Sequence, residues 1–204
     1  MARTKDENTE GQILDAAKKV FQSKGMDGAR MQEIADKAGI NKAMLHYYYR
    51  SKQLLFEAVF KNAFSLLAPQ LNAILNDDSS IEDKIRNFTS DYLTFIIKHP
   101  YLPNFIIQEL NRNPDFIAKL KENTGFPNLE KFKLQVAYEV EHGSIKPISA
   151  EQLFINIMAL NIFPFVAKPL IMAFTDTDST TFKQLMEDRK TEVSNFIINA
   201  IKPA

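Results

Sequence analysis

The stretch MQEIADKAGINKAMLH, residues 31–46, decides the fold, because it has the pattern of two short helices joined by a sharp turn. Ile34 and Ala35 take inward positions in the first helix, and Asn41 is a good N-cap for the second. Gly39 can adopt the left-handed backbone conformation of such a turn without the steric cost of a Cβ atom. The spacing therefore predicts a crossed helix pair, a helix-turn-helix, rather than a long hairpin.

A helix-turn-helix predicts which side chains meet a ligand, since the second helix of such a pair enters the major groove of DNA and the first crosses the backbone. The expected DNA contacts lie on the second helix, at the start of the first, and just beyond the second. They are Arg30, Gln32, Asn41, Lys42, Met44, His46, Tyr47, Tyr48 and Lys52. Tyr49 is expected in the core, where aromatic side chains supply packing area. Without the motif, the lysines would be interpreted as solvated charges and the tyrosines as a core cluster.

The sequence around this pair resembles the TetR family of transcriptional regulators. Residues 34–55, IADKAGINKAMLHYYYRSKQLL, are similar to the family pattern Ile-Ala-x-x-Ala-Gly-Val, then Leu-Tyr-Tyr-His-Phe, then Ser-Lys and a leucine pair. A looser similarity to the family's ligand-domain helix covers residues 143–170. The resemblance implies a dimer with an N-terminal DNA-binding domain and a helical C-terminal ligand domain.

Departures from the family pattern fall on the proposed DNA-reading helix. His46 stands where the family usually has tyrosine, Tyr48 where it has histidine, and Tyr49 where it has phenylalanine. Residues 29–31 replace threonines that often cap the helix over residues 31–38 and bind phosphate. The fold assignment is unaffected, but the operator sequence of a relative cannot be transferred to this chain.

Most of the remaining sequence has helical spacing, and no strand pattern of useful length is present. Capping boxes are expected at Thr9 with Gln12 and at Ser79 with Glu82, and Gly25 is expected to end the first helix. The helices are expected over residues 9–24, 31–38, 42–48, from 51, from 79, 105–111, near 114, from 127, from 149 and 179–201. The fold class is all-α with about nine helices: a three-helix helix-turn-helix DNA-binding domain (residues 1–52), then a larger helical ligand-binding and dimerisation domain (residues 53–204).

Composition bounds the protein class. Of the 204 residues, 45% are hydrophobic and 25% charged, the balance of an ordinary globular protein, and the absence of cysteine excludes disulfides and thiolate zinc sites. Residues 1–52 carry ten basic and seven acidic residues, a charge of +3, which leaves −3 for the remainder. The most membrane-like stretch, residues 153–174, contains two prolines and a lysine, so it is expected to be a core or interface segment. A cytoplasmic protein without membrane contact is expected.

The C-terminal half contains candidates for the ligand cavity that the resemblance implies. They are Phe88, Tyr92, Phe95, Phe105, Glu109, Phe132 and Phe163. Plain core packing is the alternative for each aromatic residue, and surface placement the alternative for Glu109. No catalytic motif or metal-ligand spacing is present, so neither enzymatic activity nor a cofactor or metal is expected.

The leading hypothesis is a repressor released from a palindromic operator by a small apolar or aromatic effector. Residues 150–162 and 179–201 would pair with the same segments of a second copy to form a homodimer. A regulator whose C-terminal domain responds to a protein partner is the alternative. A helical enzyme acting on an apolar substrate is a third possibility, which the missing catalytic residues disfavour.

Overall fold

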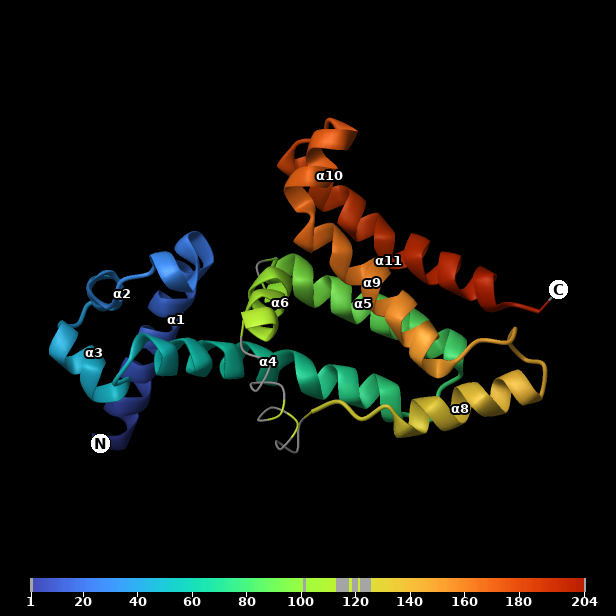
Figure 1. Cartoon of the computed structure of the whole chain (residues 1–204), viewed down its shortest axis with the longest axis horizontal. Coiled ribbons are helices and arrows are strands. Elements are labelled where there is room, and N and C mark those ends of the chain that lie inside the picture. Colours follow the sequence, from blue (N-terminus) through green and yellow to red (C-terminus); the bar gives the residue numbers. More distant parts are fainter. Residues whose placement is uncertain (1, 101, 113–117, 119–120, 122–125, 204) are drawn as a thin grey trace. The chain divides into compact units, whose positions relative to one another are not determined.

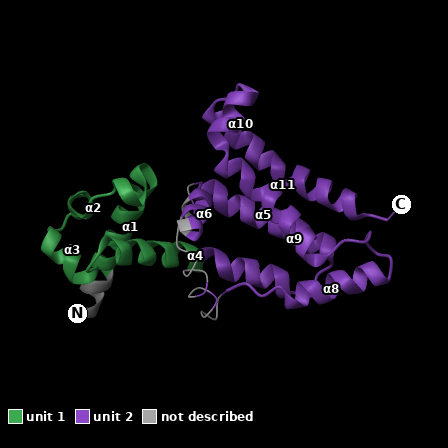
Figure 2. Cartoon of the chain, viewed as in Figure 1, with its two compact units in different colours: residues 1–65 green, residues 66–204 purple. Residues whose placement is uncertain are grey.

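The computed structural model describes residues 2–100, 102–112, 118, 121 and 126–203 (Figure 1). These residues form ten helices with short connections and no strand, so the all-α prediction is confirmed. The chain divides into two compact units, Met1–Ser65 and Leu66–Ala204 (Figure 2). The division falls inside α4 (Lys52–Asn76), a helix that starts at the predicted domain boundary.

The first unit contains α1 (Ala2–Gly28), α2 (Met31–Ala38), α3 (Lys42–Tyr48) and the beginning of α4. Its core combines the inward faces of all four helices. The buried side chains include Ile13, Ala17, Val20, Phe21, Ile34, Ala35, Leu45, Leu55 and Phe56. The rings of Phe21 and Phe56 meet edge to face with centroids 5.0 Å apart, which joins α1 to α4.

The turn between α2 and α3 has the predicted construction. Gly39 lies in the left-handed region (φ 70°, ψ 27°), and the Ile40 backbone N–H donates to the Ala35 carbonyl at 3.0 Å. The Asn41 side chain then accepts from the Met44 backbone N–H at 2.7 Å and caps α3. Both the turn and the cap are confirmed.

The predicted starts of two helices, at Thr9 and Ser79, were wrong. Helix α1 begins at Ala2 and has Thr9 in its interior. The predicted end at Gly25 coincides with a non-helical residue (φ 66°, ψ 177°), after which a short helical stretch continues to Gly28. Helix α5 (Ile81–Lys98) is capped by Ser80, whose hydroxyl accepts from the Asp83 backbone N–H at 3.1 Å. The Ser79 hydroxyl instead donates to the Asp77 carboxylate at 2.6 Å. The predicted short helix near residue 114 lies outside the described residues.

The second unit contains the end of α4, then α5, α6 (Leu102–Arg112), α8 (Glu130–Glu141), α9 (Ala150–Val166), α10 (Lys168–Thr175) and α11 (Ser179–Ile201). Helix α11 packs along α5, and α9 packs against both of them and against α6, α8 and α10 (Figure 1). In the part of the chain that the structure describes, no single helix is long and apolar enough to cross a membrane. Helices α9 and α10 pass that test of length and composition only when taken together, across a bend of 76°.

The bend after α9 follows from Pro164. Proline has no backbone N–H, so the Leu160 carbonyl four residues earlier loses its helical donor. The Arg189 guanidinium of α11 donates to that carbonyl at 2.7 Å instead. Two residues after Pro164 α9 ends, and α10 begins in a new direction.

A buried ammonium closes the connection between α4 and α5. Lys84 is only 2% exposed and donates to the backbone carbonyls of Ile74 at 3.1 Å and Asp77 at 2.8 Å. It also pairs with the Asp77 carboxylate. These bonds satisfy a charge that would otherwise be costly to bury. No sequence motif predicts that the Lys84 side chain is buried.

Two glycine substitutions should change stability in opposite directions. Gly39→Ala should lower the free energy of unfolding by about 1–2 kcal/mol, because φ is +70° there and an alanine is strained in the left-handed conformation. No neighbouring atom would clash with the added Cβ atom, so this backbone strain is the whole effect. Gly11→Ala should raise it by about 0.5–1 kcal/mol, since Gly11 is an exposed residue inside α1. Urea denaturation followed by circular dichroism measures both. Gly39→Asn is the control and should retain more stability than Gly39→Ala; a stabilising Gly39→Ala would contradict the assignment of the turn.

Candidate functional site

Helix α3 presents a row of exposed side chains. Leu45 is fully buried and fixes the helix to the first unit, while Lys42, His46 and Tyr47 face solvent. Tyr47 is 82% exposed, and its only ring contact among the described residues is the edge-to-face one with the half-buried Tyr48, at 5.6 Å between centroids. An exposed tyrosine does not stabilise the core, so it is available to a ligand. Met44 lies on the same helix and is 37% exposed.

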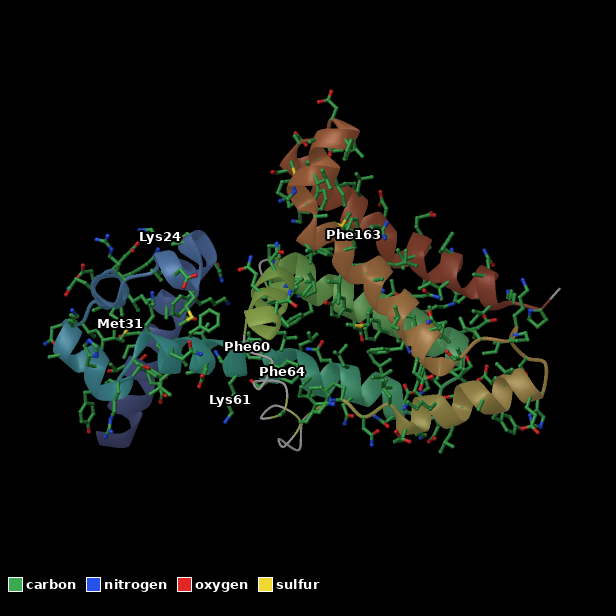
Figure 3. The ribbon with its side chains drawn as sticks, in the orientation of Figure 1. Lys24, Met31, Phe60, Lys61, Phe64 and Phe163 are labelled. Atoms are coloured by element: carbon green, nitrogen blue, oxygen red, sulfur yellow. The ribbon has the colours of Figure 1, made fainter. Side chains whose placement is uncertain are left out.

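The start of α2 supplies polar groups. Arg30 precedes α2 in an extended conformation, is exposed, and makes no side-chain cap bond. Gln32 is exposed and donates to Asp36 at 2.8 Å within the same helix. Lys24 of α1 and Glu33 form an ion pair of 2.7 Å near the start of α2, whose first residue Met31 is labelled in Figure 3.

Several exposed basic side chains of the first unit have no acidic partner among the described residues. Arg30, Lys37, Lys42 and Arg50 are exposed, and none of them makes an ion pair within the described residues. Unpaired surface cations are suited to phosphate groups, which contribute most of the sequence-independent affinity for DNA. Lys37 was not among the predicted contacts, because its place in the motif gave no reason to select it.

Lys52 has a structural role that sequence reasoning missed. Its ammonium donates to the carbonyls of Asp27 at 3.2 Å and Ala29 at 3.0 Å, which ties the start of α4 to the α1–α2 corner. One of its three N–H donors remains after these two bonds. A phosphate contact by Lys52 stays a prediction.

Tyr49 lies in the core, as expected. It is 8% exposed, and its hydroxyl donates to the Glu10 carboxylate at 2.8 Å, linking the end of α3 to α1. Burial and then this hydrogen bond raise the pKa of the Tyr49 hydroxyl, so the group is neutral at physiological pH. Tyr49 thus positions α3 and leaves Tyr47 and Tyr48 as the aromatic residues accessible to DNA.

Sequence comparison identifies this unit. A family model described as "Bacterial regulatory proteins, tetR family" matches residues 13–59, which extend from α1 into α4. The helix-turn-helix unit is therefore a TetR-family DNA-binding domain. The HTH-type transcriptional regulator RutR of Escherichia coli strain K12 is 26% identical over 196 residues, covering 94% of this chain and 89% of RutR. The HTH-type transcriptional repressor NicS of Pseudomonas putida is 27% identical over 117 residues, covering 57% of this chain and 55% of NicS.

A solved structure extends the similarity to the whole fold. The crystal structure of a TetR family transcription regulator from Marinobacter aquaeolei VT8 has a TM-score of 0.68 and 16% identity, covering 99% of this chain and 100% of that one. This likeness shows the fold. The family model and the relatives named above support a DNA-binding transcriptional regulator of the TetR family.

The structure separates the predicted ligand residues of this TetR-family regulator. Phe88 and Tyr92 of α5 are buried and stacked, with ring centroids 5.4 Å apart. Phe132 of α8 is also buried, and Phe95 is half-buried beside His99. Phe163 is 57% exposed on α9 (Figure 3). Phe105 and Glu109 belong to α6, but their side chains lie outside the described residues.

Two buried polar side chains, Thr89 of α5 and Asn161 of α9, meet between these helices. Thr89 is close in sequence to Phe88 and Tyr92. Asn161 donates to the Ile157 carbonyl at 2.8 Å and to the Thr89 hydroxyl at 3.4 Å, and both side chains are fully buried. Within the described part of the chain the Asn161 Oδ1 atom has no hydrogen-bond partner. Sequence reasoning missed this pair, although Asn161, one of two asparagines in the apolar run of α9, was a visible signal.

Replacing the two predicted DNA-contact lysines, Lys52 and Lys42, should change the free energy of unfolding by different amounts. Lys52→Met should lower the free energy of unfolding by about 1–2 kcal/mol, because two backbone carbonyls lose a charged donor. Lys42→Met should change it by less than about 0.5 kcal/mol, since Lys42 is exposed and forms no such bond. Equal effects in thermal or urea denaturation would contradict the structural role of Lys52.

Proposed function

We propose that the protein is a dimeric repressor that binds a palindromic operator through α3 and is released by a small apolar or aromatic effector. The observation that carries the proposal is the surface of α3. Lys42, His46 and Tyr47 are exposed on a short helix held in place by buried Leu45. In a helix-turn-helix, this is the helix whose N-terminal residues contact base edges. The name of NicS, a repressor, supports the sign of regulation.

Each predicted contact has a role in this proposal. Lys42, Met44, His46 and Tyr47 meet base edges or the adjacent backbone in the major groove. Arg30, Gln32, Tyr48 and Lys52 bind flanking phosphates, which fix the position of the protein on the duplex. Asn41 acts through its cap, which sets where α3 begins.

The dimer interface is proposed on the outer faces of α9 and α11. In α11, Phe182, Met186, Val193 and Ile197 are buried within the same unit. Exposed apolar side chains remain on the two helices, namely Ile155, Phe163, Leu185 and Phe196. A groove of about 430 Å³ lies beside Phe196, and its lining also includes Leu153, Asn156 and Leu160. A second copy would cover these faces symmetrically.

Effector control requires only a difference in affinity between two conformations. A ligand that binds better to the conformation with low DNA affinity shifts the population towards it, and a few kcal/mol suffices. We place the effector in the second unit, beside the stacked rings of Phe88 and Tyr92. The contributions of Phe95, Phe105, Glu109, Phe132 and Phe163 stay predictions.

A second candidate is control by a protein partner. It is favoured by α8, where Leu134 and Tyr138 are 73% and 60% exposed. Apolar side chains on one helix face can bind another protein. A regulator whose DNA affinity changes only in the presence of a second protein would support this candidate over the effector.

DNA binding should depend on α3. On a fragment containing the operator, Lys42→Ala and Tyr47→Ala should each weaken binding at least tenfold. Lys42→Ala should also reduce the salt slope by about two, because the dimer contains two copies of Lys42. Lys61→Ala is the matched control, because Lys61 is an exposed lysine of α4 (Figure 3). Fluorescence anisotropy over a salt series measures all three. Loss of affinity in Lys61→Ala alone, or no preference over random DNA, would contradict the proposal.

Dimerisation should depend on Phe196. Phe196→Lys places a charge in the proposed interface, so light scattering should show a monomer with weakened operator binding. Leu134→Lys is the matched control on α8, where the original side chain is at least as exposed, and it should remain dimeric. The reverse result would move the interface to α8.

A further inference from the structure

A small cavity lies where the end of α5, the α9–α10 junction and the start of α11 meet. Its volume is about 160 Å³. The walls are mainly apolar and are formed by Ile97, Pro100, Phe165, Phe182 and Met186. An apolar cavity of roughly 150 Å³ holds one benzene molecule, so this one has room for a single ring or a short alkyl chain. None of the aromatic residues expected to bind an effector lines it.

The polar groups of the cavity are cationic or neutral. Lys168, Ser179 and Lys183 complete the lining, and no acidic residue takes part in it. The Lys168 ammonium lies 5.2 Å from the centroid of the Phe182 ring, a cation–π contact that holds it beside the apolar wall. Neither lysine forms an ion pair or hydrogen bond with any described residue. Two lysines without anionic partners therefore border one apolar cavity.

Two acids close to the cavity residues in sequence, Asp178 and Glu187, are engaged elsewhere. The Asp178 carboxylate caps α11 by accepting from the Thr181 backbone N–H at 2.7 Å, a bond that lowers the pKa of this carboxyl. Glu187 pairs with Lys190 at 2.5 Å. Since α11 has no acidic residue in its first turn, its positive end is offset only by Asp178. The charge at the mouth of the cavity is thus suited to an anion.

We propose that this cavity binds a small carboxylate attached to one aromatic ring or a short alkyl chain. The ring or chain occupies the space between Phe165, Phe182 and Met186, and the carboxylate lies between Lys168 and Lys183, within reach of the Ser179 hydroxyl. Two cations select an anion over its neutral amide, and the volume selects against larger molecules. The binding of this ligand does not rest on the proposed function. Only its action as an effector does, and in that case the effector binds in this cavity rather than beside Phe88 and Tyr92.

Binding is tested on the full chain without DNA. Benzoate and hexanoate are the probes, and benzamide and hexanamide are their neutral counterparts, measured by isothermal titration calorimetry and thermal shift at low salt. At least one carboxylate should bind at least tenfold more tightly than its amide, and binding should weaken with salt. Equal binding of each acid and its amide, or no binding of either acid at millimolar concentration, would overturn the proposal.

Three variants locate the site. Lys168→Met and Lys183→Met should each weaken carboxylate binding, and together they should abolish the preference over the amide. Lys146→Met is the matched control, because Lys146 lines the larger groove between α9 and α11. Unchanged binding in the double variant, or an equal loss in Lys146→Met, would place the carboxylate elsewhere. Failure of the proposed operator binding would leave these outcomes unaffected, since no DNA is present.

Discussion

The direction of α3 depends on the backbone conformation of Gly39. With φ at +70°, the chain leaves α2 through a left-handed residue and enters α3 without a Cβ clash. Leu45 then anchors α3 in the core, and the Tyr49 hydroxyl bonds to Glu10 at its far end. The exposed surface of α3 is therefore a consequence of three internal restraints. Any ligand that meets Tyr47 meets a helix that is already in position.

The second unit depends on a comparable backbone feature at Pro164. The missing N–H ends α9, and Arg189 of α11 replaces the lost donor at the Leu160 carbonyl. The same bend places Lys168 beside the start of α11, where its ammonium contacts the Phe182 ring. One proline thus connects the packing of α9 and α11 to the cationic cavity. The outer faces of both helices keep apolar side chains that the unit itself does not bury.

Sequence reasoning succeeded where the determinants are local. Gly39 and Asn41 act on the next few residues, so the helix-turn-helix could be predicted with its boundaries. It failed where a distant or competing partner decides. Ser80 rather than Ser79 caps α5, and the Ser79 hydroxyl bonds to Asp77. Lys52 bonds to two carbonyls more than twenty residues away in sequence, and the helix-turn-helix motif does not predict these bonds.

The ligand domain was harder to predict because composition does not distinguish a cavity wall from a core. Phe88 and Phe163 are both phenylalanines in apolar helices, yet one is buried and the other exposed. The cavity beside Lys168 is formed by residues from four helices and the turns between them, so no single stretch of sequence contains its pattern. Its charge could be recognised only once the partners of the surrounding acids were known.

Selection from a random duplex library tests whether α3 of a symmetric dimer recognises DNA sequence. We expect enrichment of a palindromic site whose half-sites are related by the two-fold axis of the dimer and spaced by about one helical turn of 10 base pairs or a multiple of it. Selection with the Tyr47→Ala variant should lose or alter that preference, whereas Lys61→Ala should recover the same site. No enriched sequence for the unmodified protein, or the same site for the Tyr47→Ala and Lys42→Ala variants at undiminished affinity, would contradict the account.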